Sequence, residues 1–267
     1  MSKDDIVDTT LPSSGRMYDY YLGGSHNFEV DRIAADKVIK ILPFLVNFTK
    51  LQRWSLQEIA EELTLRRGYD VIIDFASGLP TADHIHNRVP AGTTVIYSDK
   101  DPVVVRYSQE IIQGIPNVYC FENDVARPEE LLNHPDVIKI LNGRRKVAIS
   151  FWGISGFLYD EEISHAMQIL YDWAAPGSCM AFNAQAAGFD PNHPGIAQML
   201  KIYESFGQES HLRTLSQFTD LIKPWKMDEK GWVSLFDWHG FDKSELSKDD
   251  QEAFGPMGGG FGSYLTK

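Results

Sequence analysis

The sequence predicts an α/β fold in which a mostly parallel sheet carries helices on both faces. Short apolar runs recur along the chain and are too continuous for strands with one solvated face. Stretches with helical spacing of apolar residues separate them, as in a parallel sheet built from crossover units. The chain has 267 residues, 43% of them hydrophobic, which suits one large domain with an elaboration. We therefore expect a doubly wound α/β sheet.

The beginning of the chain has a different pattern. Residues 13–28 are rich in Gly, Ser and Tyr, and apolar residues recur at helical spacing in 32–42 and 51–67. We predict an N-terminal lid and helical cap over residues 1–67 and a Rossmann-like sheet over residues 68–267, the two forming one structural domain.

Five apolar runs are predicted to form the parallel strands, at residues 70–75, 94–98, 118–121, 146–151 and 178–183. Helices are expected at 81–88, 102–113, 128–141, 161–174 and 194–206. Beyond residue 212 the pattern weakens. There we expect a helix near 216–222, a strand near 232–236, a polar glycine-rich loop at 244–260 and a last strand at 261–266.

Charge and composition exclude several classes of partner. The chain has 25 Lys and Arg against 37 Asp and Glu, a net charge of −12, and such a surface repels phosphate backbones, so we expect no nucleic-acid partner. No run approaches the roughly 20 apolar residues that span a bilayer, and the acidic start of the chain lacks a secretory signal. We expect a cytoplasmic protein without a membrane partner.

The two cysteines, Cys120 and Cys179, lie inside apolar, strand-like runs. In a reducing compartment such residues are typically buried thiols. Neither belongs to a metal-ligand pair, and we predict no metal site.

Polar side chains stand where three predicted strands end. Asp74 ends the first strand, Asp99 follows the second 25 residues later, and Asn123 and Asp124 follow the third. Ligands bind at the carboxyl ends of strands in open α/β sheets, and an acid after the second strand can hold ribose hydroxyls. A full G-x-G-x-x-G is absent, so the pattern favours a nucleoside over a dinucleotide. The alternative is that these residues cap helices or lie solvated in loops.

Three unusual motifs occur in order: RMYDYYLGG at residues 16–24 with NF at 27–28, SGLPTA at 77–82, and YSDKDPV at 97–103. Through most of residues 16–183 the chain resembles a bacterial family of S-adenosylmethionine (SAM)-dependent methyltransferases with the class I fold. The resemblance implies a seven-stranded, Rossmann-like sheet whose last strand is antiparallel, with SAM as the ligand.

The resemblance also implies roles for individual residues. Ser77 and Gly78 would line the methionine end, Asp99 would hold the ribose, and the segment from Arg16 to Phe28 would fold over the ligand as a lid. Arg16 could pair with the ligand carboxylate. The full set of implied cofactor-binding residues is Arg16, Tyr20, Gly23, Asp74, Ala76, Ser77, Gly78, Asp99, Lys100, Asn123, Asp124 and Val125, with the adenine at Asn123 and Asp124. Ala76 departs from the family, which commonly has glycine there.

Four aromatic residues are candidates for a cage around the sulfonium. Tyr18 and Tyr21 belong to the lid, and Phe151 and Trp152 end the fourth strand. Aromatic rings around a desolvated cation add roughly 0.5–2 kcal/mol each. The alternatives are that Phe151 and Trp152 are core residues and that the tyrosines pack in the lid without touching the cation.

Three activities are consistent with this resemblance. A SAM-dependent methyltransferase acting on a small molecule needs mainly to position a nucleophile and exclude water. Without an external acceptor, the amine of SAM can attack its own γ-carbon, giving azetidine-2-carboxylate and methylthioadenosine, as in the azetidine-2-carboxylate synthases that resemble this family. A third possibility is a non-catalytic SAM-binding protein. The acceptor, any catalytic base and the oligomeric state stay open.

Other conspicuous residues have structural interpretations. His84 and His86 would point about 200° apart on a helix, which disfavours joint metal chelation. Trp225, Trp232 and Trp238 are candidates either for the wall of an acceptor pocket or for the core.

Overall fold

The computed structural model describes residues 10–81, 83–242, 247–248 and 260–267. Its helices, in chain order, are α1 (Ser14–Tyr21), α2 (Glu29–Ile41), α3 (Leu45–Glu61), α4 (Pro102–Ile111), α5 (Pro128–Leu132), α6 (Pro135–Leu141), α7 (Asp160–Trp173), α8 (Pro194–Glu204), α9 (Leu215–Leu221) and α10 (Leu235–Trp238). The strands are β1 (Val71–Phe75), β2 (Thr94–Asp99), β3 (Val118–Glu122), β4 (Ala148–Phe151), β5 (Cys179–Ala184), β6 (Lys226–Met227), β7 (Val233–Ser234) and β8 (Phe261–Thr266). A π-helical turn (Glu62–Arg66) extends α3.

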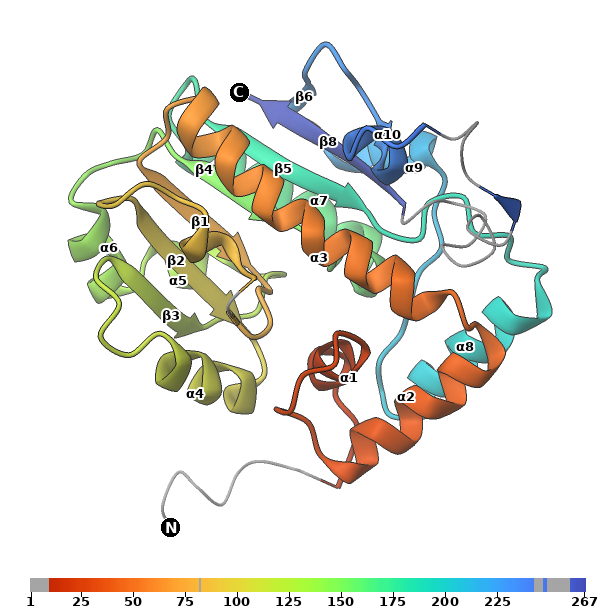
Figure 1. Ribbon diagram of the computed structural model, residues 1–267. Coiled ribbons are helices and arrows are strands. Elements are labelled where there is room, and N and C mark those ends of the chain that lie inside the picture. The colour runs from red at the N-terminus through yellow and green to blue at the C-terminus, as the bar shows by residue number, and fades with distance from the viewer. Residues whose placement is uncertain (1–9, 82, 243–246, 249–259) are drawn as a thin grey trace.

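The strands form one sheet in the order β3-β2-β1-β4-β5-β8-β6, with β7 also pairing with β8 (Figure 1). Strands β1 to β5 are parallel, whereas β8 runs antiparallel to β5. Among the described residues the sheet has eight strands because two-residue strands flank β8. The predicted doubly wound, mostly parallel sheet with an antiparallel last strand is confirmed. The order reverses between β1 and β4, the point at which open α/β sheets bind ligands.

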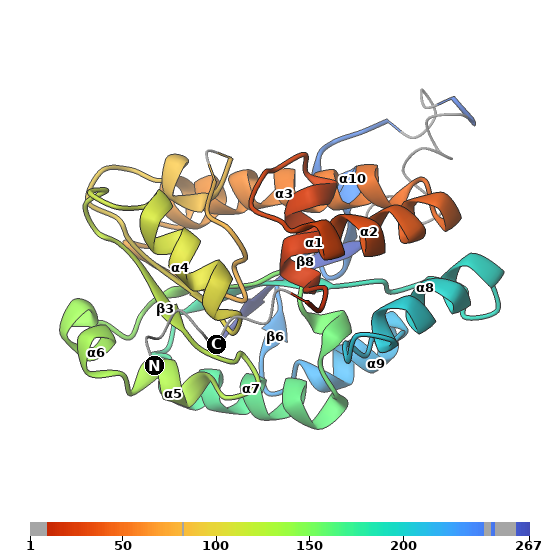
Figure 2. The ribbon, with the colours of Figure 1, turned by 90° about the horizontal axis from the view of Figure 1, so that it is seen from below.

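Helices cover both faces of the sheet, with α3, α4 and α10 on one side and α5, α6, α7 and α9 on the other (Figure 2). Alternate residues of one strand divide between the two faces because side chains on a strand alternate. Ile72 packs under α3 with Leu56 and Ile59, and its neighbour Ile73 packs under α7 with Met167. Both faces of β1 are buried, which accounts for its continuous apolar sequence.

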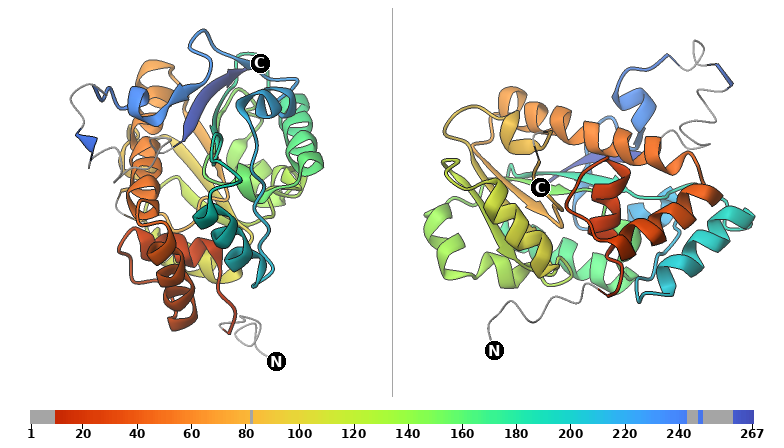
Figure 3. Two further views of the ribbon diagram at one scale, coloured as in Figure 1. Left: turned by 90° about the vertical axis from the view of Figure 1, so that its right-hand side faces the viewer. Right: turned by 60° about the horizontal axis from the view of Figure 1, so that its bottom comes forward.

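A third apolar cluster lies beyond the carboxyl ends of the strands, where α1 and α2 meet α8 (Figure 3). Its residues include Met17, Val38, Phe48 and Ile196. The cap thus combines N-terminal helices with α8, a distant part of the chain, while most of α3 packs on the sheet. The predicted boundary at residue 67 remains a prediction.

The segment predicted as a helix at residues 81–88 contains only a short 3₁₀ turn, Ile85–Asn87. The helix prediction there was wrong because side chains bind the local backbone. Arg53 donates to Leu79 O and to the Thr81 hydroxyl, each at 2.9 Å, and His84 Nδ1 accepts from the Ile85 N–H at 2.8 Å. Residue 82 lies outside the described residues.

Two further expectations need correction. The single helix expected at 128–141 is two helices, because Pro135 opens α6 and restricts the residue before it. The strand expected near 232–236 is the two-residue β7, after which the Ser234 side chain caps α10. The loop expected at 244–260 lies almost wholly outside the described residues. Helix α1 lies in the segment expected to form a lid, and Gly23 and Gly24 of the motif at residues 16–24 follow the end of this helix.

Cys120 and Cys179 are both buried free thiols, as predicted. None of the described helices combines the length and apolarity needed to span a bilayer.

Candidate functional site

A cavity of about 650 Å³ opens at the carboxyl ends of the strands. One half, here called the cofactor half, is polar and lies along the tips of β1, β2 and β3. It is lined by Ala76, Ser77, Gly78, Asp99, Lys100, Asp101, Glu122, Asn123, Asp124, Val125, Arg127 and Glu130. The other half, here called the helical half, is mostly apolar and is formed by α1, α3, α8 and the segments after β4 and β5. It is lined among others by Tyr18, Tyr21, Leu45, Phe48, Thr49, Gln52, Arg53, Leu56, Trp152, Phe157, Gln185, Tyr203 and Phe206.

Asp99 ends β2 and lies on the cavity wall. Its two carboxylate oxygens accept from the N–H groups of Gly78 and Asp101, each at 3.0 Å. Burial raises the pKa of Asp99 to about 6, although both backbone donors favour the ionised form. The carboxylate is therefore fixed in place and is an acceptor at neutral pH, as a ribose contact requires.

Asp74 was predicted to bind the cofactor but lies behind the cavity wall. It is 2% exposed, does not line the cavity, and its Oδ2 lies 3.7 Å from His84 Nε2 without a hydrogen-bond partner among the described residues. Burial raises the pKa of Asp74 to about 7. His84 accepts at Nδ1 from the Ile85 N–H, so a neutral His84 carries its proton on Nε2, which lies 3.2 Å from Ser77 O. Asp74 and His84 thus support the loop after β1 from the side away from the cavity.

The loop after β1 places backbone atoms on the cavity wall. Gly78 has φ +61°, and Ala76 has φ +51°. A positive φ favours glycine, so the backbone at Ala76 is held in a strained conformation that a glycine would adopt freely.

The tip of β3 supplies Asn123, Asp124 and Val125 to the cavity wall. Asn123 donates from Nδ2 to Arg127 O at 3.1 Å, while its buried Oδ1 has no partner among the described residues. Asp124 accepts from the Ala126 N–H at 3.0 Å. Because an unpaired buried acceptor costs about 1–3 kcal/mol, Asn123 Oδ1 is suited to receive a donor from a ligand.

Helix α1 places Tyr18 and Tyr21 on the wall of the helical half. Burial raises the pKa of Tyr18 to about 12 and also raises that of Tyr21. The Tyr21 hydroxyl lies 3.4 Å from the Tyr203 hydroxyl of α8, whereas the Tyr18 hydroxyl has no hydrogen bond to any described residue. Both phenols are neutral at physiological pH.

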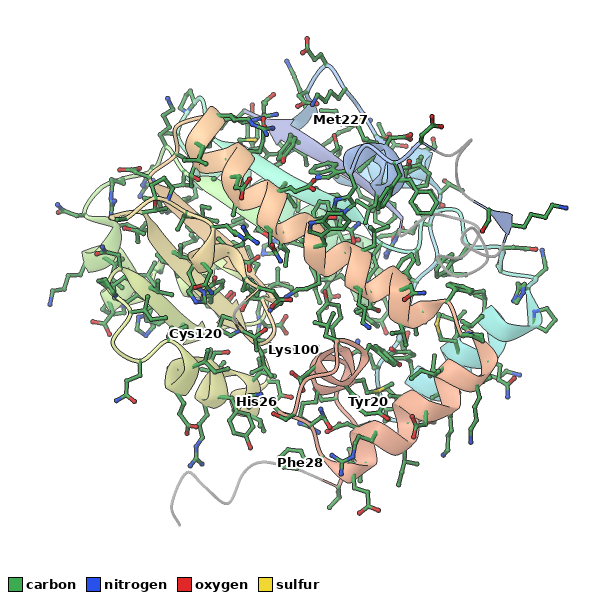
Figure 4. All side chains as sticks on the ribbon, viewed as in Figure 1. Tyr20, His26, Phe28, Lys100, Cys120 and Met227 are labelled. Atoms are coloured by element: carbon green, nitrogen blue, oxygen red, sulfur yellow. The ribbon has the colours of Figure 1, made fainter. Side chains whose placement is uncertain are left out.

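Three predicted ligand contacts from the lid do not line this cavity. Arg16 is 3% exposed and donates to Asp31, to Asp101 and to a backbone carbonyl, so its guanidinium is committed to protein partners rather than to a ligand carboxylate. Tyr20 lies on the side of α1 that faces α2, where its hydroxyl donates to Asp36 (Figure 4). Gly23 lines a smaller second cavity next to the main one.

The two aromatic residues after β4 have different environments. Phe151 is fully buried under the sheet, stacked on Phe182 at 5.5 Å, and does not line the cavity. Trp152 follows the end of the strand, lines the cavity and donates from Nε1 to Gln52 O at 3.1 Å. Of the two roles considered for Phe151, cage ring or core residue, the structure therefore shows the core residue. Trp238 packs behind Trp152, 5.4 Å between ring centroids.

Of the two roles considered for Trp225, Trp232 and Trp238, the structure shows the core role: Trp225 is buried, and the partly buried Trp232 and Trp238 pack against the core. Trp225 is buried and donates to Met167 O, and Trp232 donates to the Thr219 hydroxyl. Neither these nor Trp238 line the cavity.

The contribution of α3 to the cavity was not predicted from the sequence. Thr49, Gln52 and Arg53 are buried polar residues at positions i, i+3 and i+4, on the same stripe as the apolar residues of that helix. Gln52 donates to Asn183 Oδ1 at 3.2 Å, and Arg53 pairs with Asp83 at 3.0 Å. Polar residues interrupting a buried helical stripe were the signal that could have located them.

A reversed parallel order, an antiparallel last strand and an acid fixed at the second strand's tip together define a Rossmann-like, nucleoside-binding protein. A family model for S-adenosyl methyltransferases matches residues 1–262. The chain belongs to that family of SAM-dependent methyltransferases, and its cofactor is S-adenosylmethionine. A search of curated proteins found no match to this chain.

Solved structures agree with this assignment. The fold is similar to that of a candidate methyltransferase from Thermobifida fusca YX, with 27% identity and a TM-score of 0.85 over 100% of this chain and 99% of that one. It is also similar to a DUF574 family protein from Streptomyces avermitilis MA-4680, with 24% identity and a TM-score of 0.85 over 97% of this chain and 99% of that one. The second likeness concerns the fold alone.

The residues of the cofactor half fit SAM. The Asp99 carboxylate can accept from ribose hydroxyls, and the unpartnered Asn123 Oδ1 can accept from an adenine amine. The positive φ of Gly78 allows its backbone to approach a ligand closely.

Proposed function

We propose that this protein transfers the methyl group of SAM to a small molecule held in the helical half of the cavity. The observation that carries the proposal is that a single cavity extends from Asp99 and Asn123 to Tyr21 and Trp152. Its volume of about 650 Å³ is in the range of pockets that hold whole organic ligands. A nucleoside on the strand tips would leave the apolar end for a second, smaller ligand.

The chemistry required of the protein is modest. SAM supplies an activated methyl group on its sulfonium, so the chain must orient the two ligands and exclude water. Orientation of this kind can lower a barrier by roughly 7–11 kcal/mol. Tyr18 and Trp152 contribute ring surfaces to the cavity wall, and such rings favour a desolvated cation by about 0.5–2 kcal/mol.

The experiment that tests this proposal is a product analysis. The purified protein is incubated with SAM alone, and then with SAM and a panel of small aromatic amines, phenols and thiols. S-adenosylhomocysteine that forms only when an acceptor is present supports methyl transfer. Asp99→Asn serves as the matched variant, since weakened SAM binding should lower acceptor-dependent product.

Two other results would contradict the proposal. Methylthioadenosine formed from SAM alone, well above the rate without protein, indicates the cyclisation to azetidine-2-carboxylate. Tight SAM binding without any turnover across the panel indicates a non-catalytic SAM-binding protein.

A further inference from the structure

The charged groups of the cavity are unevenly distributed. The carboxylates on its described wall all belong to the tips of β2 and β3 or follow them: Asp99, Asp101, Glu122, Asp124 and Glu130. In the helical half the described charged side chain is Arg53, which pairs with Asp83. Acidic groups therefore gather on the cofactor half and leave the helical half without a described carboxylate.

The remaining polar groups of the helical half are neutral. Thr49, Gln52 and Gln185 supply a hydroxyl and two amides, and most of the other surface is aromatic or aliphatic. Burying a charged ligand without an opposite charge is costly. A protonated amine would also bring a second positive charge close to the sulfonium. This half of the cavity is suited to a flat, uncharged ligand.

The part of the helical half that the structure describes also lacks a group that could remove a proton at neutral pH. Apart from the Arg53 guanidinium, which is already a cation, its described titratable side chains are Tyr18, Tyr21 and Tyr203. Burial raises the pKa of each above the usual value, so all three are protonated. No described histidine lines the cavity. Asp74, whose pKa lies near 7, is behind the wall. A hydroxyl acceptor would find no base among the described residues of this half.

We propose that the helical half binds a neutral aromatic molecule with a pyridine-type ring nitrogen and that this nitrogen receives the methyl group. The inference rests on the proposed function and adds the class of acceptor. The nitrogen lone pair forms the N–CH₃ bond while the S–CH₃ bonding pair returns to sulfur. The positive charge moves from sulfur to nitrogen, and no proton is released. Aromatic rings such as that of Trp152 then face a cationic product.

The test uses three probes of similar shape: isoquinoline with a ring nitrogen, 2-naphthol with a hydroxyl, and 2-naphthoate with a carboxylate that is ionised at neutral pH. Each is added at neutral pH to protein saturated with methyl-labelled SAM, and label transfer is compared with a protein-free control. We expect transfer to isoquinoline to exceed that to 2-naphthol by about 100-fold, the low end of what a general base contributes. Transfer to 2-naphthoate should be absent.

Equal or faster methylation of 2-naphthol or 2-naphthoate would overturn the inference, and so would a failure of isoquinoline to bind the SAM-loaded protein. Calorimetry with SAM alone comes first, because it tests SAM binding separately from the class of acceptor. Absence of SAM binding contradicts the proposed function, whereas SAM binding with the wrong probe preference contradicts only the acceptor class.

A near-isosteric variant provides a second test. Gln185→Glu places a carboxylate in the helical half, and it keeps the acceptor that the Gly156 N–H now binds at 3.2 Å. We expect the added base to raise the rate with 2-naphthol at least about tenfold, within the range of a positioned base, and not to raise the rate with isoquinoline. An equal effect on both probes would contradict the inference.

A matched pair of tryptophan variants tests where the probe binds. Trp152→Leu removes an aromatic wall of the helical half and should weaken isoquinoline binding to the SAM-saturated protein about tenfold, or about 1.4 kcal/mol. Trp54→Leu is the control because Trp54 is 43% exposed on the same stretch of α3 and does not line the cavity. Equal losses in both variants would place the probe elsewhere.

Discussion

Arg16 donates from Nη1 to Asp101 Oδ2 at 3.1 Å, and this bond joins α1 to the segment after β2. The Ser13 hydroxyl donates to the same oxygen at 2.8 Å. The backbone N–H of Asp101 in turn donates to Asp99 Oδ1 at 3.0 Å. One residue thus connects the helix that covers the cavity to the carboxylate proposed to hold the ribose.

Removing the Arg16 guanidinium should destabilise the cap. Arg16→Met leaves Asp31, which is fully buried, without its ion-pair partner, and breaking a buried pair costs about 3–5 kcal/mol. The free energy of unfolding in urea measures the loss. Arg66→Met is the control, because the Arg66 side chain is 74% exposed and exposed pairs contribute about 0–1 kcal/mol. Equal losses would mean that Arg16 does not stabilise the cap as described.

Asp99→Asn should weaken SAM binding by about 1–3 kcal/mol, the usual cost of leaving a buried hydrogen-bonding group poorly paired. The amide can accept at one atom only, whereas the carboxylate accepts at both. Calorimetric titration with SAM measures the change. Asp136→Asn, an exposed position in the first turn of α6, should leave the affinity unchanged. An unchanged affinity in Asp99→Asn would remove this carboxylate from the site.

Asp74→Asn should stabilise the ligand-free protein in a pH-dependent way. Burial raises the pKa of Asp74 from 3.8 to about 7, so between these values the folded state binds more protons than the unfolded state. The contribution of this group to stability therefore falls as the pH rises through that window.

The gain in Asp74→Asn should consequently be full near pH 8 and absent near pH 4, with Tm rising by about 2–4 °C for each kcal/mol gained. Thermal unfolding of both proteins at the two pH values is the measurement. A Tm difference that is the same at both pH values would show that Asp74 is not buried in the ionised state.

The glycines after α1 should differ in their tolerance of alanine. A Cβ at Gly24 would overlap the carboxylate of Asp19, which accepts from the His26 N–H and from Asn27 Nδ2. A Cβ at Gly23 meets nothing within 4 Å, although its φ of +82° is strained for alanine. We expect Gly24→Ala to lower Tm more than Gly23→Ala, whose cost should be about 1 kcal/mol. The reverse order would contradict the described turn.

Much of the sheet could be predicted because its strands are buried on both faces and read as unbroken apolar runs. The same logic located Asp99 and Asn123, since a polar residue directly after a buried strand must lie at the edge where parallel strands end. The 3₁₀ turn at Ile85–Asn87 was not predictable, because it depends on hydrogen bonds from Arg53, which is far away in the sequence.

The helical half of the site was harder to predict for the same kind of reason. Phe151 and Trp152 are neighbours, yet the end of β4 places one under the sheet and the other on the cavity wall. Arg16 has the residue type of a carboxylate ligand, but tertiary contacts with Asp31 and Asp101 occupy it. Local pattern specifies residue chemistry, whereas the partner that satisfies it depends on the packing of distant elements.

Binding of SAM on the strand tips under α1 can be tested directly and without an acceptor. The measurement is amide hydrogen exchange with and without saturating SAM. We expect protection in peptides covering residues 13–21, 76–79, 99–103 and 122–126, and little change in peptides of α6 or of the sheet's opposite end. Saturating SAM that leaves those four segments unprotected, or that protects only other parts of the chain, would contradict the account.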